Sequence, residues 1–187
     1  SYDSIERVGA TNVAAAAANC GIGRLAYVSG AGIGEIPSNS KLFAIKAAAI
    51  AAVIDSGVEY TIFKPTHFME SLPQFVRGQR AVIIGHQPHR YHYLAAIDYA
   101  DLVSRSFGIK AAANQSLTIF GPEALTMAEA LRVYCDAVHP GMEVGSMPVN
   151  LARLVGWLTR NRELSFACGL FADFARFGEH GDPTVTG

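Results

Sequence analysis

The sequence has 187 residues, a mass of 19.9 kDa and a mean hydropathy of +0.22, and half of its residues are hydrophobic. These values exclude a disordered tail and favour a domain with a large buried core. The 15 basic and 16 acidic residues nearly cancel and form no basic stripe, so the sequence gives no sign of a nucleic-acid partner.

The longest apolar run, residues 47–54, is too short to span a bilayer. The three cysteines are widely spaced and form no Cys-x-x-Cys pair, which favours a reducing compartment, and we expect a cytoplasmic protein. The sequence starts at Ser1 in a helical pattern and shows no signal-peptide pattern. We therefore expect it to be part of a longer protein.

The periodicity of the first half predicts alternating helices and strands. A helix is expected over 2–19, a strand over 24–29, a helix over 41–55 after the possible N-caps Ser38 and Asn39, and a strand over 60–63 stopped by Pro65. This alternation with short connections is typical of a parallel sheet wrapped by helices.

The second half has a looser pattern. Strands are expected over 81–84, 91–96 and 116–120. A helix over 99–107 is expected to be capped by Asp98, a second helix starts at the capping box of Thr126 and Glu129, and residues 148–177 read as mainly helical. The aromatic residues within 148–177 are typical of a core, or else of an exposed apolar surface for a partner.

Two predicted strands end in segments that are expected to share one edge of the sheet. Ser29 and Gly30 follow the first strand, and Pro65, Thr66 and His67 follow the second. In open α/β sheets, ligands bind at the carboxyl ends of the strands. Glycines at 30, 32 and 34 would let a ligand approach the backbone, although they equally suit a tight loop and do not form the Gly-x-Gly-x-x-Gly fingerprint.

Lys46 interrupts an apolar stripe on the helix predicted over 41–55. It lies four residues after Leu42 and four before Ile50. An unpaired lysine facing a core is costly, so its ammonium should reach a polar cleft or a partner, or else extend to water while its stem packs.

The sequence contains two kinds of notable histidine. His86, His89 and His92 recur at intervals of three, but Pro88 separates them and no cysteine or carboxylate lies nearby, so a polar turn between two strands is favoured over a zinc site. His67 follows a strand end, where an imidazole could hold a substrate oxygen or bond within its own loop.

Several segments together resemble the NmrA-like branch of the atypical short-chain dehydrogenase/reductase superfamily. The resemblance rests on their order and spacing, and it extends over nearly the whole chain. They are Gly-Ile-Gly-Arg-Leu-Ala-Tyr-Val-Ser at 21–29, the helix with Lys46, residues 56–65, Phe-Met-Glu at 68–70, and the later segments 98–103, 117–126 and 178–183.

The resemblance implies an α/β fold with a Rossmann-like, doubly wound parallel sheet whose N-terminal part is missing, and a small, mainly helical C-terminal substrate region. It divides the chain into residues 1–66, the C-terminal half of an NAD(P)-binding domain, and residues 67–187, the rest of the sheet with a substrate or partner region. The glycine-rich diphosphate loop would precede Ser1.

The resemblance also implies a cofactor, NAD(P) with NADP preferred, and the residues that bind it. These residues are Ser29, Gly30, Lys46, Pro65, Thr66, His67 and Phe68, with Lys46 as the catalytic residue. Leu42 stands four residues before Lys46, where classical members carry a tyrosine, and leucine cannot donate a proton to a carbonyl.

Two functions follow. One is an NAD(P)H-dependent oxidoreductase acting on an unsaturated or quinone-like small molecule, in which the cofactor supplies the chemistry. The other is a non-catalytic NAD(P)H-sensing regulator, assembly factor or accessory subunit with a protein partner. Leu42 favours the non-catalytic function, whereas the presence of Ser29 and Lys46 is consistent with the oxidoreductase.

Overall fold

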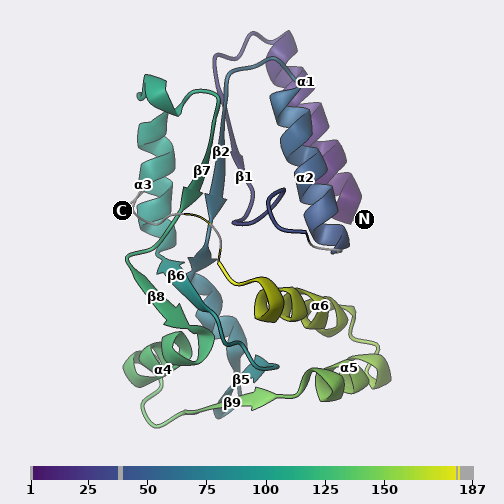
Figure 1. Cartoon of the computed structure of the whole chain (residues 1–187), viewed down its shortest axis with the longest axis vertical. Helices are drawn as coiled ribbons and strands as arrows, with labels where there is room; N and C mark the ends of the chain where they lie inside the picture. Colours follow the sequence, from purple (N-terminus) through teal and green to yellow (C-terminus); the bar gives the residue numbers. More distant parts are fainter. Residues whose placement is uncertain (1, 38–39, 180, 182–187) are drawn as a thin grey trace. The chain divides into compact units, whose positions relative to one another are not determined.

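The computed structural model describes residues 2–37, 40–179 and 181, and the chain divides into two compact units (Figure 1). The first unit comprises Ser1–Thr66, Ala96–Phe120 and His180–Gly187, and the second comprises His67–Ala95 and Gly121–Glu179. The chain thus leaves the first unit after Thr66 and returns to it at Ala96 for an α-helix, a short 3₁₀ helix and a strand.

The first unit is a parallel sheet covered by helices. Its three strands are ordered β1-β2-β7, with Tyr27 opposite Ile62 and Phe63 opposite Leu117. Its elements are η1 (Ser4–Val8), α1 (Gly9–Asn19), β1 (Leu25–Val28), α2 (Lys41–Ile54), β2 (Tyr60–Pro65), α3 (Ala96–Ser106), η3 (Lys110–Ala112) and β7 (Gln115–Ile119).

The central strand β2 is buried on both faces, as strands of parallel sheets are. Helices α1 and α2 lie side by side on one face, and Ala14 and Val53 pack there on Ile62 (Figure 1). Helix α3 covers the other face, where the ring of Tyr99 meets that of Phe63 edge-on at 6.2 Å. The predicted helix–strand alternation is therefore confirmed.

The second unit contains two small sheets, with strand orders β3-β6-β8 and β4-β5-β9. Its core joins Leu131 and Cys135 of the helix α4 to Ala81 and Tyr91 of the strands. Its elements are β3 (His67–Phe68), η2 (Met69–Phe75), β4 (Val76–Arg77), β5 (Arg80–Ile84), β6 (Arg90–Leu94), β8 (Glu123–Thr126), α4 (Met127–Val138), β9 (Glu143–Met147), α5 (Val149–Leu158) and α6 (Arg162–Phe177).

Helix α4 starts with the capping box that its sequence predicts. The Thr126 hydroxyl accepts a hydrogen bond from the Glu129 N–H at 3.2 Å, and the Glu129 carboxylate accepts one from the Thr126 N–H at 2.8 Å. These reciprocal bonds satisfy two N–H groups that a helix start otherwise leaves open.

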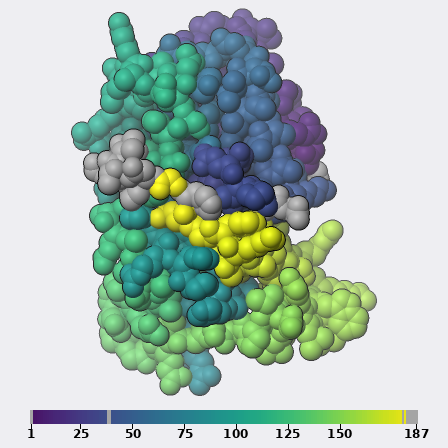
Figure 2. All heavy atoms as spheres, viewed as in Figure 1, coloured from purple at the N-terminus to yellow at the C-terminus, as the bar shows by residue number. Residues whose placement is uncertain are grey.

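Helices α5 and α6 pack side by side within the second unit, α6 in yellow in Figure 2. Some aromatic residues of this region belong to a core and others to an exposed apolar surface, the two alternatives that the sequence left open. Phe171 is buried in the core, whereas the Trp157 side chain on α5 is 75% exposed. No described helix is long and apolar enough to cross a membrane.

Some details differ from the sequence predictions or lie outside the described residues. The helix expected from Tyr99 starts at Ala96, so Asp98 lies in its first turn rather than at its cap. Strands β3, β4, β8 and β9 were not predicted, because all four are short and none of their residues is fully buried. The proposed caps Ser38 and Asn39 lie outside the described residues, and α2 begins after Ser40.

Candidate functional site

Two backbone segments meet at the carboxyl ends of β1 and β2, as the sequence predicts. The Ser29 N–H donates to the Phe63 carbonyl at 2.8 Å, and the Ala31 N–H donates to the Pro65 carbonyl at 3.0 Å. The Thr66 N–H donates in turn to Ile119 of β7 at 3.1 Å. Ser29, Gly30, Pro65 and Thr66 therefore share one edge of the first unit's sheet.

The loop after Ser29 turns back on itself and is closed by an ion pair. Gly32 and Gly34 have φ values of 76° and 80°, a region that glycine enters without strain. The ammonium of Lys64, a buried residue on β2, donates to the Glu35 carboxylate at 2.6 Å. This pair fixes the far end of the loop to the central strand.

The Ser29 side chain is the unusual group at this edge. Its hydroxyl is shielded from solvent and has no hydrogen-bond partner among the described residues. A buried polar group without a partner costs about 1–3 kcal/mol. Such a group at the carboxyl end of a parallel strand suits a bound ligand that supplies the missing hydrogen bond.

The Lys46 ammonium bonds to Glu6 of η1, with 3.0 Å between Nζ and Oε2. The Tyr27 hydroxyl lies 3.5 Å from the same carboxylate oxygen. Of the alternatives for Lys46, the structure therefore selects a partner. Both side chains of the ion pair are mostly buried, at 19% and 24% exposure.

Tyr27 is held in its protonated form by this arrangement. Burial, and then the neighbouring Glu6 carboxylate, raise the pKa of Tyr27 to about 12. Its phenol consequently remains a hydrogen-bond donor toward Glu6 at neutral pH.

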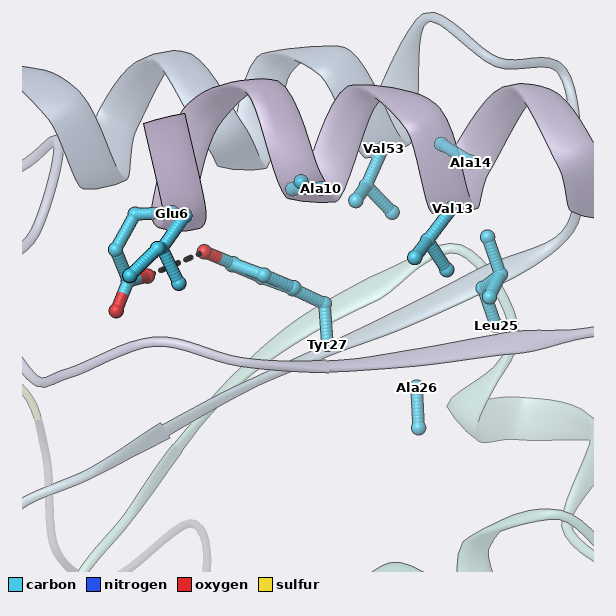
Figure 3. A pocket seen from close by; sticks show the side chains of 10 residues that line it. Glu6, Ala10, Val13, Ala14, Leu25, Ala26, Tyr27 and Val53 are labelled. Carbon is cyan, nitrogen blue, oxygen red and sulfur yellow. Dashed lines mark hydrogen bonds between the residues drawn. The ribbon is translucent and has the colours of Figure 1, made fainter. Parts of the chain in front are cut away.

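A pocket of about 370 Å³ opens beside this cluster, between η1–α1 and β1 (Figure 3). Glu6 and Tyr27 stand at one end, and Val13, Leu25 and Val53 line the rest, whereas the Ala26 side chain points away from α1. Within the described residues, β1 is paired only with β2. The pocket thus runs along the unpaired edge of β1 and is mostly apolar.

His67 and Phe68 begin the second unit as strand β3. The His67 ring packs against Tyr91, Tyr93 and Phe174, at centroid distances of 4.4, 5.7 and 5.0 Å. Burial lowers the pKa of His67 to about 4, so its imidazole is neutral at pH 7. Neither ring nitrogen of His67 has a partner among the described residues, so the hydrogen bond within its own loop is not formed there.

The three spaced histidines lie where the sequence places them, around the turn between β5 and β6. His89 Nε2 is 3.1 Å from the Ala175 carbonyl, and His92 Nδ1 bonds to the Glu179 carboxylate. Within the described residues there is no group of three metal-ligating side chains. These bonds tie the turn to α6 and the segment after it.

Sequence reasoning missed Glu6, Tyr27 and Tyr93. Glu6 is one of several polar residues in the helix expected over 2–19, and only the helix packing brings it to Lys46, 40 positions away. Tyr93 alternates with Tyr91 along a strand, a pattern of inward-facing residues that could have indicated a shared aromatic face.

The comparisons with known proteins add to this geometry. No protein-family model matches the sequence, and no curated protein is significantly similar to it. Solved structures do match, among them the NADPH-dependent quinone oxidoreductase of Escherichia coli complexed with NADPH, with 19% identity and a TM-score of 0.75 over 97% of this chain and 65% of that one.

Two other reductases match in the same way. The triphenylmethane reductase of Citrobacter sp. complexed with NADP(H) has 16% identity and a TM-score of 0.72, over 96% of this chain and 64% of that one. The leucoanthocyanidin reductase of Vitis vinifera with NADPH has 14% identity and a TM-score of 0.73, over 97% and 64%.

This chain shares their fold. The Rossmann-like α/β architecture expected from the sequence is thereby confirmed. The chain spans about two thirds of the length of these reductases, 64–65%.

Proposed function

We propose that this chain is the nicotinamide-side part of an NAD(P)H-dependent oxidoreductase of the atypical short-chain dehydrogenase/reductase type, acting on an unsaturated or quinone-like small molecule. The observation that carries this proposal is the Ser29 hydroxyl at the carboxyl end of β1, which is shielded from solvent and has no hydrogen-bond partner in the part of the chain that the structure describes. It is supported by a fold shared with reductases solved with NADPH or NADP(H), which also favours NADP over NAD.

The residues at the carboxyl edge of the first unit fit the nicotinamide end of the cofactor. Ser29 offers a hydroxyl that no described residue bonds, and Gly30 offers backbone without a side chain of its own. We assign Pro65 and Thr66 to the same site, because their backbone is bonded to the Ser29 loop and to β7. His67 and Phe68, the next residues along the chain, are assigned on the family resemblance.

Bound NAD(P)H would supply a hydride, and a quinone that accepts it also takes one proton from water to become a hydroquinone. Leu42 has no proton to give, so this chain's residues position the reactants and do not act as the tyrosine acid of classical members. Lys46 would serve the cofactor by exchanging the Glu6 carboxylate for a ribose hydroxyl.

The alternative function, a non-catalytic NAD(P)H sensor or accessory subunit, is favoured by one specific observation. The Lys46 ammonium is already neutralised by Glu6, so a cofactor must compete with an existing ion pair. In a sensor, that exchange would change the packing of η1 without any turnover.

The proposal is tested by measuring NADPH binding and NADPH oxidation with duroquinone as acceptor. Because the chain spans about two thirds of its neighbours' length, 64–65%, titrations should extend to high cofactor concentrations. Ser29→Ala removes one hydrogen bond to the cofactor and should weaken binding by about two- to tenfold.

Ser116→Ala is the matched control, because Ser116 is exposed on β7. Binding that depends on Ser29, with oxidation of NADPH, supports the reductase. The same binding without oxidation supports the sensor, and absence of any binding of NADPH or NADH contradicts both.

A further inference from the structure

The second unit contains an aromatic cluster built around one histidine. His67 of β3 and Tyr93 of β6 are register partners on neighbouring parallel strands, and their ring centroids are 5.7 Å apart. Tyr91 lies 4.4 Å from the His67 ring and Phe174 of α6 lies 5.0 Å from it. We call these four side chains the His67 cluster.

Two members of the His67 cluster lack hydrogen bonds. Both ring nitrogens of His67 and the Tyr93 hydroxyl are shielded from solvent and have no partner among the described residues. By contrast, the Tyr91 hydroxyl donates to the Phe174 carbonyl at 2.7 Å, and the Gln87 amide nitrogen donates to the Ile84 and Phe171 carbonyls, although the Gln87 amide oxygen also lacks a partner among the described residues. An adjacent pair of unsatisfied groups calls for a ligand or a bound water.

The hydrogen-bonding capacity of this pair matches a carbonyl oxygen. A neutral imidazole presents one donor and one acceptor, and a tyrosine hydroxyl presents a donor. A carbonyl accepts two hydrogen bonds, one from each side chain. The flanking rings of Tyr91 and Phe174 favour a planar, conjugated molecule.

We propose that His67 and Tyr93 bind the carbonyl oxygen of a planar, quinone-like ligand whose ring packs against Tyr91 and Phe174. The carbonyl class rests on the proposed function, whereas the site rests on the cluster alone. His67 and Phe174 are half-buried, so the cluster reaches the protein surface, and a ligand enters by displacing a ring that now shields the polar atoms.

Both side chains remain uncharged while they do this. Burial lowers the pKa of His67 to about 4, and burial together with the Glu179 carboxylate raises the pKa of Tyr93 to about 12. They therefore position an oxygen through hydrogen bonds between neutral groups at pH 7. Both act as positioning residues for a substrate carbonyl.

The test is binding of duroquinone to the chain without NADPH, by calorimetry or by saturation-transfer NMR. Duroquinone is methylated at every ring carbon that could add a thiol, so the exposed Cys20 does not capture it. Tyr93→Phe and His67→Phe each keep a ring but remove a hydrogen-bonding group, and each should weaken binding by about two- to tenfold.

Matched controls come from a second histidine–tyrosine contact in the same unit. The rings of Tyr134 and His139 meet edge-on at 5.9 Å, and Tyr134→Phe and His139→Phe should leave duroquinone binding unchanged. Tyr93→Phe should also raise or preserve the melting temperature of the ligand-free chain, because it deletes a buried group that lacks a partner.

Weaker binding in the Tyr93 variant and not in the controls supports the inference. Absence of duroquinone binding, or binding that Tyr93→Phe leaves unchanged, overturns it and assigns the pair to a structural water. If His67→Phe does not fold, Tyr93→Phe decides alone. Because the experiment contains no NADPH, a negative result for duroquinone does not contradict the proposed cofactor site. A negative result for NADPH binding likewise does not affect the interpretation of duroquinone binding.

Discussion

Replacing Lys46 by methionine is the substitution for which the sequence and the structure predict the most different losses of stability. From sequence alone, this substitution keeps the packing of the stem and deletes an ammonium that faces a cleft, so little stability should be lost. In the structure the ammonium is the partner of Glu6, and both side chains are mostly buried, at 19% and 24% exposure. Lys46→Met therefore leaves a carboxylate without its cation.

The size of the effect follows from this burial. Exposed ion pairs contribute about 0.2–1 kcal/mol, and removing one partner of a fully buried pair costs about 3–5 kcal/mol. A pair of intermediate burial should cost about 1–2 kcal/mol. For a chain of this size, that lowers the melting temperature by about 2–8 °C.

The assay is thermal and urea unfolding followed by circular dichroism, with a double-mutant cycle. Glu6→Gln with Lys46→Met should be more stable than Lys46→Met alone, because the double variant contains no unpaired charge. Lys41→Met, at the exposed start of the same helix, is the control for losing a lysine from α2. Equal stabilities of the Lys46 and Lys41 variants would refute the buried-pair reasoning.

Four further outcomes are expected. Glu6→Gln should lower the pKa of Tyr27 from about 12, measured by the tyrosinate absorbance that disappears in Tyr27→Phe. Because this pKa rises on folding, the contribution of Tyr27 to the free energy of unfolding should be complete below pH 10.0 and lost as the pH rises toward 12. The pKa of His67 falls from 6.5 to about 4 on folding, so its neutral ring should contribute up to about 3 kcal/mol to the free energy of unfolding above pH 6.5, and this contribution should be lost as the pH falls to 4. His67→Phe should flatten this part of the pH dependence measured by urea unfolding. Lys46→Met should weaken NADPH binding by about ten- to a hundredfold in calorimetry, while Glu6→Gln, which frees the lysine, should not weaken it. Because β1 has an unpaired edge within the described residues and Val28 on it is exposed, we expect the chain to self-associate there. Val28→Lys should therefore reduce self-association in sedimentation, and an effect of zero would exclude this edge as its cause.

Much of the first unit could be predicted from local sequence signals. Apolar periodicity defined α1 and α2, and short β-rich runs defined β1 and β2. The meeting of Ser29 with the segment of Pro65 was also predictable, because the carboxyl ends of parallel strands share one edge of a sheet. These are signals that a short window of sequence carries.

The partners of the site residues could not be predicted in the same way. Periodicity placed Lys46 on an apolar face, but nothing local indicated that its ammonium would meet Glu6, 40 positions earlier. The missing partners of Ser29 and Tyr93 are likewise a property of the folded chain, since they depend on which groups packing brings near. Whether a buried polar group finds a hydrogen-bond partner depends on residues far away in the sequence, whereas sequence patterns describe only neighbouring residues.

The central claim is that the edge around Ser29 binds the nicotinamide end of a reduced dinucleotide. Saturation-transfer NMR on NADPH with this chain tests it most directly, because the method reports which ligand protons contact protein even when binding is weak. The account predicts the strongest transfer to the nicotinamide and its ribose, with a clear decrease in Ser29→Ala and none in Ser116→Ala. Transfer confined to the adenine, or no transfer at all, would contradict it.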